Sequence, residues 1–396
     1  MWGNTRGGST PLPSTKMLKT IKTEKLPIKV WADDVDPKTL GQAKNLANLP
    51  SAFHHIAIMP DAHVGFGMPI GGVLATKGTI VPYAVGVDIG CGMQAIETDI
   101  NVDNLKPKVK EILAALAQEI PLGYEHHKES QSWQTFAKAP KSPIIVQEIE
   151  AAKKQLGTLG GGNHFLEILV DDKETIWLMV HSGSRNFGYK TAGYYYKKAR
   201  EINPNGGELA WLDLSSNLGQ EYFLAMNFST LFARENRTRL LEKFIEIVER
   251  IVGPFVEISR LDTHHNYAAE EEHFGQQVIV HRKGAVYAAN GERVIIPGSM
   301  GSKSFIAEGL GNLESFLSCS HGAGRAIGRR EATRRLNYQK VAEVLQKQGV
   351  EILAKNKGDL IAESPFAYKD IEKVMELQVD LAKPIVTLRP LGVVIG

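Results

Sequence analysis

The sequence contains very few cysteines, with Cys91 and Cys319 the only two in 396 residues. Two cysteines form at most one bridge, which excludes a disulfide framework, and we expect both side chains as thiols. The chain also lacks the run of about 18 apolar residues that a membrane-spanning helix needs. Its N-terminal stretch has no apolar core of the kind found in signal peptides. We therefore expect a cytoplasmic protein.

An excess of charge of one sign is lacking as well. The chain has 46 Lys and Arg residues against 44 Asp and Glu residues, which leaves a formal net charge of +2. A polyanionic partner would therefore have to bind a local basic surface. Hydrophobic residues make up 43% of the chain and charged residues 23%, a composition typical of a globular enzyme with a large core.

Hydrophobic periodicity predicts mixed β-sheets surrounded by helices. Residues 1–26 are rich in Gly, Ser, Thr, Pro and Lys without periodicity, which predicts a flexible N-terminal extension before one catalytic domain at 27–396. Helices are expected at 106–120, 220–252, 338–348 and 367–381, the second long or broken with a basic, solvated side, and strands at 165–170, 175–180, 277–280, 285–288 and 293–297. Because no repeating βαβ order appears, the expected fold class is α+β.

Two glycine-rich stretches come close to known phosphate-binding loops. GFGMPIG at 65–71 spaces its glycines one residue too far apart for the dinucleotide fingerprint, and no helix is expected after it. GSMGSKS at 298–304 has no glycine directly before Lys303, so it is not a Walker A loop, although its backbone amides could bind phosphate. Spacing alone favours glycine turns at strand ends for both.

Four histidines next to small or polar residues give a stronger signal. They are His164 in GGGNHF, His181 in VHSGSR, His265 in DTHHNY and His321 in SCSHGAGR. One such histidine is more often a surface or hydrogen-bonded core residue than a functional one, and Cys91 alone could be a small buried hydrophobe. Four of them together favour a site with ligands and nucleophiles.

A carboxylate and a thiol complete the set. Asp88 and Cys91 lie three residues apart in VGVDIGCGM and can point at one spot. With three of the histidines they are enough to hold two divalent ions through a shared thiolate, and these ligands favour zinc, with manganese or cobalt next. Neither HExxH nor paired CxxC occurs, which excludes the common zinc hydrolases and zinc fingers. His321 remains as a histidine that need not be a ligand.

Eight short blocks, taken together, carry a further signal. In order from residue 60 to residue 325 they are PDAHVGFGMPIGGV, GVDIGCGM, LGGGNHFLE, VHSGSR, HHNYA, RKGA, PGSMGSKS and SHGAGR. They resemble the signature blocks of the RNA-splicing ligase RtcB family. The resemblance implies a single α+β domain and a GTP- and manganese-dependent RNA ligase for tRNA splicing or RNA repair. Such an enzyme joins an RNA 3′-phosphate or 2′,3′-cyclic phosphate end to a 5′-hydroxyl end.

The resemblance also implies roles for single residues. Two Mn²⁺ ions, with the thiolate as bridge, would be held by Asp88, Cys91, His164, His181 and His265. His321 falls on the guanylylated histidine, and Asp61 on the carboxylate that orients its ring. The residues around the guanylate would be Asn163, Glu167, Asn266, Pro297, Gly298, Ser299, Met300, Ser304, Gly322, Ala323 and Gly324, with Arg185, Lys283 and Arg325 meeting phosphates of GTP or RNA. Besides RNA and GTP, an archease-type activator is an expected partner.

One departure from the family pattern lies at the C-terminus. The family commonly ends in Val-Lys-Gly with the lysine close to the guanine, whereas this chain has Ile395 at that position. An isoleucine can pack on a purine but donates no hydrogen bond, so we expect weaker or less selective use of GTP. Two alternatives to the ligase stay open, a metal-dependent phosphoesterase acting on RNA cyclic phosphate ends and a catalytically weakened RNA-binding paralogue.

Overall fold

The computed structural model describes residues 18–396, so residues 1–17 of the predicted extension lie outside it. The strands are β1 (Lys19–Ile21), β2 (Ile28–Val30), β3 (Ala52–His63), β4 (Ile70–Thr76), β5 (Thr79–Ile80), β6 (Gly92–Asn101), β7 (Phe165–Asp171), β8 (Thr175–Ser182), β9 (Leu212–Asp213), β10 (Glu257–His264), β11 (Asn266–His273), β12 (Gln276–Lys283), β13 (Ala285–Tyr287), β14 (Arg293–Ile296), β15 (Ser304–Gly309), β16 (Ser318–Ser320), β17 (Glu351–Ala354) and β18 (Ala382–Ile395). The α-helices are α1 (Pro37–Ala47), α2 (Pro82–Val85), α3 (Val102–Leu105), α4 (Val109–Glu119), α5 (Pro143–Gln155), α6 (Arg185–Ile202), α7 (Asn217–Val252), α8 (Arg329–Arg335), α9 (Tyr338–Lys347), α10 (Lys357–Ala362) and α11 (Ile371–Glu376).

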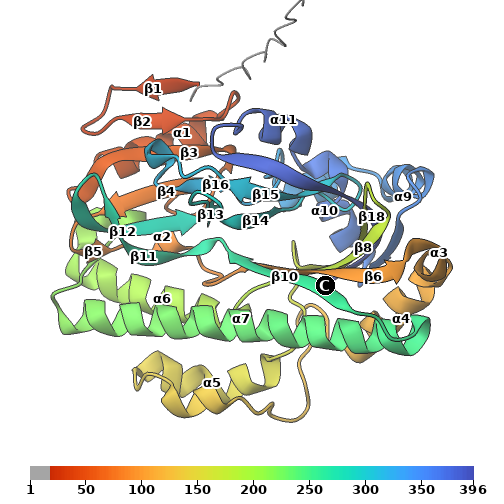
Figure 1. The fold of residues 1–396 in the computed structure, drawn as a ribbon. Coiled ribbons are helices and arrows are strands. Elements are labelled where there is room, and N and C mark those ends of the chain that lie inside the picture. The colour runs from red at the N-terminus through yellow and green to blue at the C-terminus, as the bar shows by residue number, and fades with distance from the viewer. Residues whose placement is uncertain (1–17) are drawn as a thin grey trace, which may run out of the picture.

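Two large sheets occupy the centre of the molecule, and helices cover them (Figure 1). One sheet has the strand order β1-β2-β3-β4-β12-β11, and the other has the order β10-β6-β8-β7-β18-β15-β14, with β17 paired to β18. Neighbouring strands are mostly antiparallel, and no repeating βαβ order occurs among the described elements. The expected α+β class is therefore confirmed.

The chain passes from one sheet to the other at a single residue, His265. β10 pairs with β6 in the larger sheet, and β11 pairs with β12 in the six-stranded sheet. Figure 1 shows the two strands as one ribbon across the middle of the molecule. At the crossing, the backbone N–H of His265 donates to Cys91 O at 2.9 Å, and Gly284 N–H donates to His265 O at 2.7 Å. Segments distant in sequence therefore meet between the sheets.

The long helix α7 runs beneath both sheets (Figure 1). It is continuous, which settles the choice between a long and a broken helix, and it begins where the Ser216 side chain accepts a hydrogen bond from Gly219 N–H. Its inner face buries large side chains, including Phe232 and Phe244, and this apolar contact stabilises the helix. The expected solvated basic side is only partly present, because Arg237 is buried to 1% exposure. No helix within residues 18–396 is long and apolar enough to span a membrane.

Several predicted elements are present with small shifts. The helix expected at 106–120 is α4, preceded by one 3-10 turn at Lys106–Lys108. The hairpin of β7 and β8 closes at Glu174, which has φ 61°, and the Asp171 carboxylate accepts hydrogen bonds from the N–H groups of Lys173 and Thr175. The strand expected at 277–280 extends to Lys283, because β12 pairs with strands on both sides.

Two expectations are corrected by tertiary pairing. The first residues of the folded part lie before Pro27, because Lys19–Ile21 pairs with β2 as an antiparallel strand. The helix expected at 367–381 is confined to α11, because Tyr368 adopts an extended conformation and bridges to Arg325. These pairings give backbone N–H and C=O groups hydrogen-bond partners from other segments of the chain, which local hydrophobic periodicity does not indicate.

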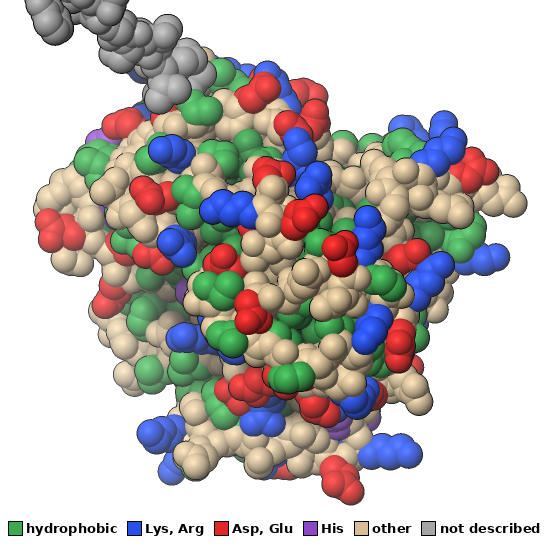
Figure 2. Space-filling model, turned by 45° about the vertical axis from the view of Figure 1, so that its right-hand side comes forward, with side chains coloured by type: hydrophobic (Ala, Val, Ile, Leu, Met, Phe, Trp, Pro, Cys, Tyr) green, Lys and Arg blue, Asp and Glu red, His purple; other side chains and the backbone are tan. Residues whose placement is uncertain are grey.

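The charges on the surface are mixed, as the small net charge predicts. On the face shown in Figure 2, Lys and Arg side chains alternate with Asp and Glu side chains, and hydrophobic side chains appear between them. Many of the charges form surface pairs, such as Arg260 with Glu257 and Lys303 with Glu372. Any anionic ligand must therefore be recognised by a local group of side chains.

A buried ion pair gives a stability prediction for this fold. Arg282 is fully buried and pairs with Glu271, and it also donates to Phe316 O at 2.8 Å and Ser318 Oγ at 2.8 Å. We expect Arg282→Met to lower the free energy of unfolding by about 3 kcal/mol or more, because it removes the cation from the partly buried Glu271 carboxylate and the donor from the buried Phe316 O and Ser318 Oγ. Urea unfolding measures this change.

The matched control is Arg250→Met, since Arg250 pairs with Glu119 at the surface and keeps half its side chain exposed. This substitution should cost less than about 1 kcal/mol. Equal losses in the two variants would contradict the assigned role of the buried pair.

Candidate active site

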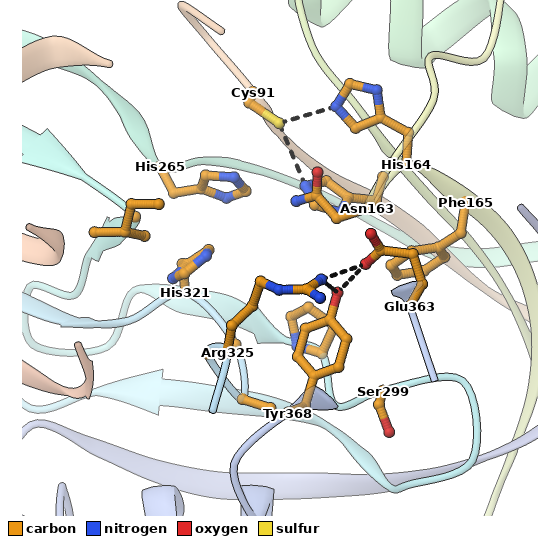
Figure 3. A pocket seen from close by; sticks show the side chains of 18 of the residues that line it. Cys91, Asn163, His164, Phe165, His265, Ser299, His321, Arg325, Glu363 and Tyr368 are labelled. Carbon is orange, nitrogen blue, oxygen red and sulfur yellow. Dashed lines mark hydrogen bonds and ion pairs between the residues drawn. The ribbon is translucent and has the colours of Figure 1, made fainter. Parts of the chain in front are cut away.

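A cavity of about 300 Å³ opens between the two sheets, around the crossing at His265 (Figure 3). The residues predicted from the sequence that line it are Asp88, Cys91, Asn163, His164, Glu167, His181, His265, Asn266, Lys283, Pro297, Gly298, Ser299, Met300, His321, Gly322, Ala323, Gly324 and Arg325. Three predicted residues, Asp61, Ser304 and Arg185, lie outside its lining. The fold thus brings all eight sequence blocks to the cavity wall, with VHSGSR contributing His181.

The five predicted metal ligands form two groups that share Cys91. The ligand atoms of Cys91, His181 and His265 lie within 4.8 Å of one another, and so do those of Asp88, Cys91 and His164. Cys91 Sγ lies 3.4 Å from His164 Nε2 (Figure 3) and 3.3 Å from His181 Nε2, and His164 Nε2 lies 3.0 Å from Asp88 Oδ2. A sulfur atom common to two such groups is the arrangement that bridges two divalent ions.

The protonation of these groups suits a metal. Burial, followed by the neighbouring imidazoles, holds the pKa of His181 and His265 well below the usual value, so both rings are neutral and keep a lone pair. Burial, followed by the charge of Asp88, raises the pKa of the Cys91 thiol. A coordinated cation reverses that shift, because a thiol that binds a metal loses its proton. Metal binding would therefore release a proton.

An unpartnered buried atom points the same way. His265 Nδ1 is buried and has no hydrogen-bond partner within the described part of the chain, and the His265 ring centroid lies 5.3 Å from that of His181. Buried polar atoms are nearly always paired, so each exception calls for an explanation. The orphaned ring nitrogen of His265 and the sulfur, nitrogen and oxygen donors of the cluster together fit a divalent metal centre.

The loop after β8 passes so close to Asp88 that it has no room for a side chain. A Cβ atom at Gly183 would lie 2.2 Å from Asp88 Oδ2, which makes glycine necessary at this position. The next residue, Ser184, donates its backbone N–H to Asp88 Oδ1 at 2.9 Å and its hydroxyl to the same atom at 3.2 Å. The carboxylate is thereby fixed toward His164.

Arg237 of α7 holds the backbone next to two ligands. Its Nη1 donates to Gly90 O at 2.7 Å and to Ser182 O at 3.2 Å, and its Nη2 donates to Asp262 Oδ1 at 2.8 Å. Gly90 precedes Cys91, and Ser182 follows His181. One buried guanidinium therefore fixes the strand ends that carry the thiol and an imidazole.

His321 lies beside the metal ligands with one ring nitrogen held from behind. Its ring centroid is 4.8 Å from that of His265, and its Nδ1 lies 2.6 Å from Oδ2 of the fully buried Asp61. Donation of Nδ1–H to this carboxylate leaves the lone pair on Nε2. A Cβ at Gly284 would lie 3.1 Å from His321 Cε1, so this glycine leaves the ring its place in the cavity.

The wall of the cavity formed by β7 and β18 is apolar apart from one carboxyl group. In the antiparallel register of β7 and β18, Phe165 faces Ile395 and Glu167 faces Val393, so all four side chains point to the same face of the sheet. All four line the cavity. Glu167 is 3% exposed, and burial raises its pKa to about 8. This carboxyl group is therefore mostly protonated at neutral pH.

Two of the three cationic side chains predicted to contact phosphates already donate hydrogen bonds to other groups of the protein. Arg185 donates to Thr158 Oγ1 at 2.9 Å and Gly123 O at 2.7 Å. Arg325 donates from Nε to Ile327 O, from Nη2 to Ala362 O, and from Nη1 to Glu363 and the Tyr368 hydroxyl. Their main observed role is to connect segments around the cavity.

The third cation, Lys283, does line the cavity. Its ammonium group donates to Phe66 O and to Tyr83 O, the latter at 3.1 Å, and burial lowers its pKa to about 7. Two donations leave one N–H of a charged ammonium group free for a ligand. A phosphate in the cavity would favour the charged form.

Sequence reasoning missed a second set of lining residues. Arg329 donates to Glu363 Oε1 at 2.8 Å and to Asn163 Oδ1 at 3.0 Å, and Glu363 also accepts from Arg325 and Tyr368 (Figure 3). The stretch GRR at 328–330, two residues beyond the SHGAGR block, was the available signal for Arg329. Glu363 and Tyr368 had none, because they lie in and beside the segment for which a helix was expected. His63 and Phe165, each adjacent to or within a quoted block, were also passed over.

A mixed two-sheet fold that holds a cysteine-centred ligand cluster beside a carboxylate-held histidine is compatible with the class of metal-dependent enzymes. Sequence comparison narrows this class. The profile of the family described as tRNA-splicing ligase RtcB matches residues 42–143 and 134–396. The chain therefore belongs to the RtcB family.

Named relatives cover nearly the whole chain. The RNA-splicing ligase RtcB of Escherichia coli K12 is 38% identical over 95% of this chain and 99% of its own length. The tRNA-splicing ligases RtcB of Pyrobaculum aerophilum and Thermococcus kodakarensis are each 31% identical, over 94% and 96% of this chain and 95% and 96% of their own lengths. The family likeness therefore extends well beyond the cavity.

Replacement of the shared sulfur tests the ligand cluster. We expect Cys91→Ser to lose most of the divalent metal, because a serine hydroxyl does not ionise as a thiol does and cannot bridge two ions as a soft ligand. Elemental analysis after equilibration with Mn²⁺ measures the metal per chain. Cys319→Ala is the matched control, because Cys319 is a buried thiol outside the cluster. Equal metal content in the two variants would contradict a bridging role.

Proposed function

We propose that this chain is a GTP- and manganese-dependent RNA ligase that acts in tRNA splicing or RNA repair. It joins an RNA 3′-phosphate or 2′,3′-cyclic phosphate end to a 5′-hydroxyl end. The main observation in support is the Asp61–His321 pair, in which Nε2 of His321 remains free next to the Cys91-centred ligand cluster. The relatives are named RNA-splicing and tRNA-splicing ligases, and these names support the same activity. The proposed partners are RNA, GTP and an archease-type activator.

Two Mn²⁺ ions form the proposed metal centre. One would be held by Asp88, Cys91 and His164, and the other by Cys91, His181 and His265, the two groups whose ligand atoms lie together. When bound, such ions offset negative charge on a triphosphate and on a leaving pyrophosphate. We propose manganese rather than zinc because the resemblance to the RtcB family implies manganese.

His321 is the proposed nucleophile of the first step. Its Nε2 attacks the α-phosphorus of GTP, an N–P bond forms, and the bond to the bridging oxygen breaks so that pyrophosphate leaves. The ring gains positive charge as the bond forms. Asp61, hydrogen-bonded to Nδ1, stabilises this charge and keeps the ring in the reactive orientation.

RNA is the acceptor in the later steps. An oxygen of the RNA 3′-phosphate attacks the phosphorus of the guanylate, the N–P bond breaks, and His321 is restored. The 5′-hydroxyl then attacks the activated 3′-phosphate, and GMP leaves as the new phosphodiester forms. A cyclic end is first opened by water. Each cycle converts one GTP into GMP and pyrophosphate.

The proposed nucleophile predicts a covalent adduct on His321. Incubation with GTP and Mn²⁺ should add one GMP to this residue, detected by mass spectrometry. Asp61→Asn should slow its formation by roughly 10³-fold to 10⁴-fold, because the amide favours the wrong tautomer of the ring. Absence of the adduct in the unmodified protein would exclude the ligase. Hydrolysis of RNA cyclic phosphate that persists in His321→Ala would favour a phosphoesterase.

The buried Glu167 predicts a pH-dependent choice between GTP and ATP. Guanine presents two N–H donors that a carboxylate accepts, whereas protonated Glu167 keeps one proton of its own. With the pKa of Glu167 near 8, ionisation between pH 7 and pH 9 should raise the ratio of GTP to ATP adduct. Ile395→Lys should lower that pKa and raise the ratio already at pH 7.

Ile395→Met is the matched control for this experiment, because it keeps the position apolar and should leave the pH profile unchanged. The adduct with each nucleotide is measured by mass spectrometry across the pH series. A high and pH-independent preference for GTP in the unmodified protein would contradict a base choice set by Glu167.

A further inference from the structure

Four aromatic residues form what we call the aromatic rim: Phe66, Tyr83 and Tyr196, whose rings contact one another, and Tyr189, which lies near enough to Tyr83 to add to the effect of burial in raising the pKa of its hydroxyl. The rings of Tyr83 and Tyr196 stack with centroids 3.8 Å apart, and Phe66 meets Tyr83 edge-on at 4.7 Å. Phe66 is 49% exposed and Tyr189 is 58% exposed. Large rings exposed together are unusual on a soluble surface and mark a contact site.

Each element of the rim leads directly into the proposed active site. Phe66 follows β3 and the cavity-lining His63, and Tyr83 belongs to α2, which is followed by the cavity-lining Gly86. Tyr189 lies in the first turns of α6, directly after the loop that fixes Asp88. The rim is thus continuous with the site in three separate segments.

Lys283 connects the rim to the cavity through the backbone. Its ammonium group holds Phe66 O and Tyr83 O, and the same side chain lines the cavity. A Cβ at Gly67 would lie 3.2 Å from Tyr83 Cβ, so the loop that carries Phe66 rests against α2. The two segments are therefore held at a fixed position relative to the site.

The exposed side of α6 adds unpaired positive charge. Lys190 and Lys197 are exposed and have no ion-pair or hydrogen-bond partner in residues 18–396. Gly193 lies between them on the helix, and a Cβ there would meet nothing within 4 Å. The acidic residue nearby, Glu208, already accepts a hydrogen bond from Gly67 N–H at 2.9 Å. Open space, exposed rings and free ammonium groups thus lie side by side.

We propose that the aromatic rim binds single-stranded RNA next to the ends that are joined, by stacking unpaired nucleobases on Phe66 and Tyr189. This inference rests on the proposed function. Exposed rings beside free lysines are the recurring means of holding a single strand, because every base has a face to stack on and every nucleotide carries a phosphate. The strand would reach the cavity over Lys283. Phosphates along α6 would meet Lys190 and Lys197.

Binding of a short RNA tests the rim without any ligation. A fluorescent single-stranded oligonucleotide with a 5′-hydroxyl end is titrated with the unmodified protein, Phe66→Ala, Tyr189→Ala and the double variant, in the absence of GTP. We expect each single variant to weaken binding by about fivefold or more. An oligonucleotide that lacks its terminal bases but keeps its phosphates should bind all four proteins with similar affinity.

Two further variants separate stacking from charge and from general damage. Lys190→Ala should reduce the dependence of affinity on salt, whereas Phe66→Ala should leave that dependence unchanged. Phe274→Ala removes an exposed ring at the turn between β11 and β12, the opposite end of β12 from Lys283, and should bind RNA as the unmodified protein does. Thermal unfolding confirms that the variants are folded.

The result that overturns the proposal is unchanged RNA affinity in the folded Phe66→Ala, Tyr189→Ala double variant. Equal weakening with the base-free oligonucleotide would overturn it as well, since the rings would then not act through bases. These outcomes do not depend on the adduct at His321. A missing GMP adduct would reject the ligase, and an unaffected RNA affinity would reject the rim.

Discussion

The buried guanidinium of Arg237 is the contact on which the geometry of the site depends. It lies where α7 passes under both sheets. It donates hydrogen bonds to the carbonyl groups of Gly90 and Ser182 and to the carboxylate of Asp262. A buried cation is tolerated only when such acceptors surround it. The strand ends that carry Cys91 and His181 cannot separate without leaving Nη1 of this buried cation short of its carbonyl acceptors. Their spacing is therefore set by the fold before any metal arrives.

The two ends of the cavity offer different chemistry on one sheet face. His181, Phe165 and Ile395 lie opposite one another across β8, β7 and β18, so a single row leads from the ligand cluster to the apolar end. Charged groups of a ligand belong near the cluster, and a flat ring belongs near Phe165 and Ile395. A nucleotide has this same division between phosphates and base. The row thus gives a nucleotide one favourable direction in the cavity.

Much of the site could be predicted from the sequence because its residues lie in short blocks with distinctive spacing. Cys91, the histidines and Asp61 were all found this way, and the structure brings them together. Glu363 and Tyr368 were missed because their role comes from a tertiary bridge between Arg325 and Tyr368, which no local pattern encodes. Because of the same bridge, the helix expected at 367–381 is confined to α11. For Arg185 and Arg325, the sequence predicted cations but not the carbonyl groups that occupy them.

For the fold, periodicity predicted the long helix, the β7–β8 hairpin and the α+β class, since these depend on local patterns. The division into two sheets could not be predicted, because strand partners are chosen by contacts far apart in the chain. That division has a mechanical consequence at His265, the single residue between β10 and β11. The backbone of His265 joins the two sheets, so an ion held by His265 and Cys91 would link the sheets where they meet, and separating the sheets there would weaken the binding of the ion.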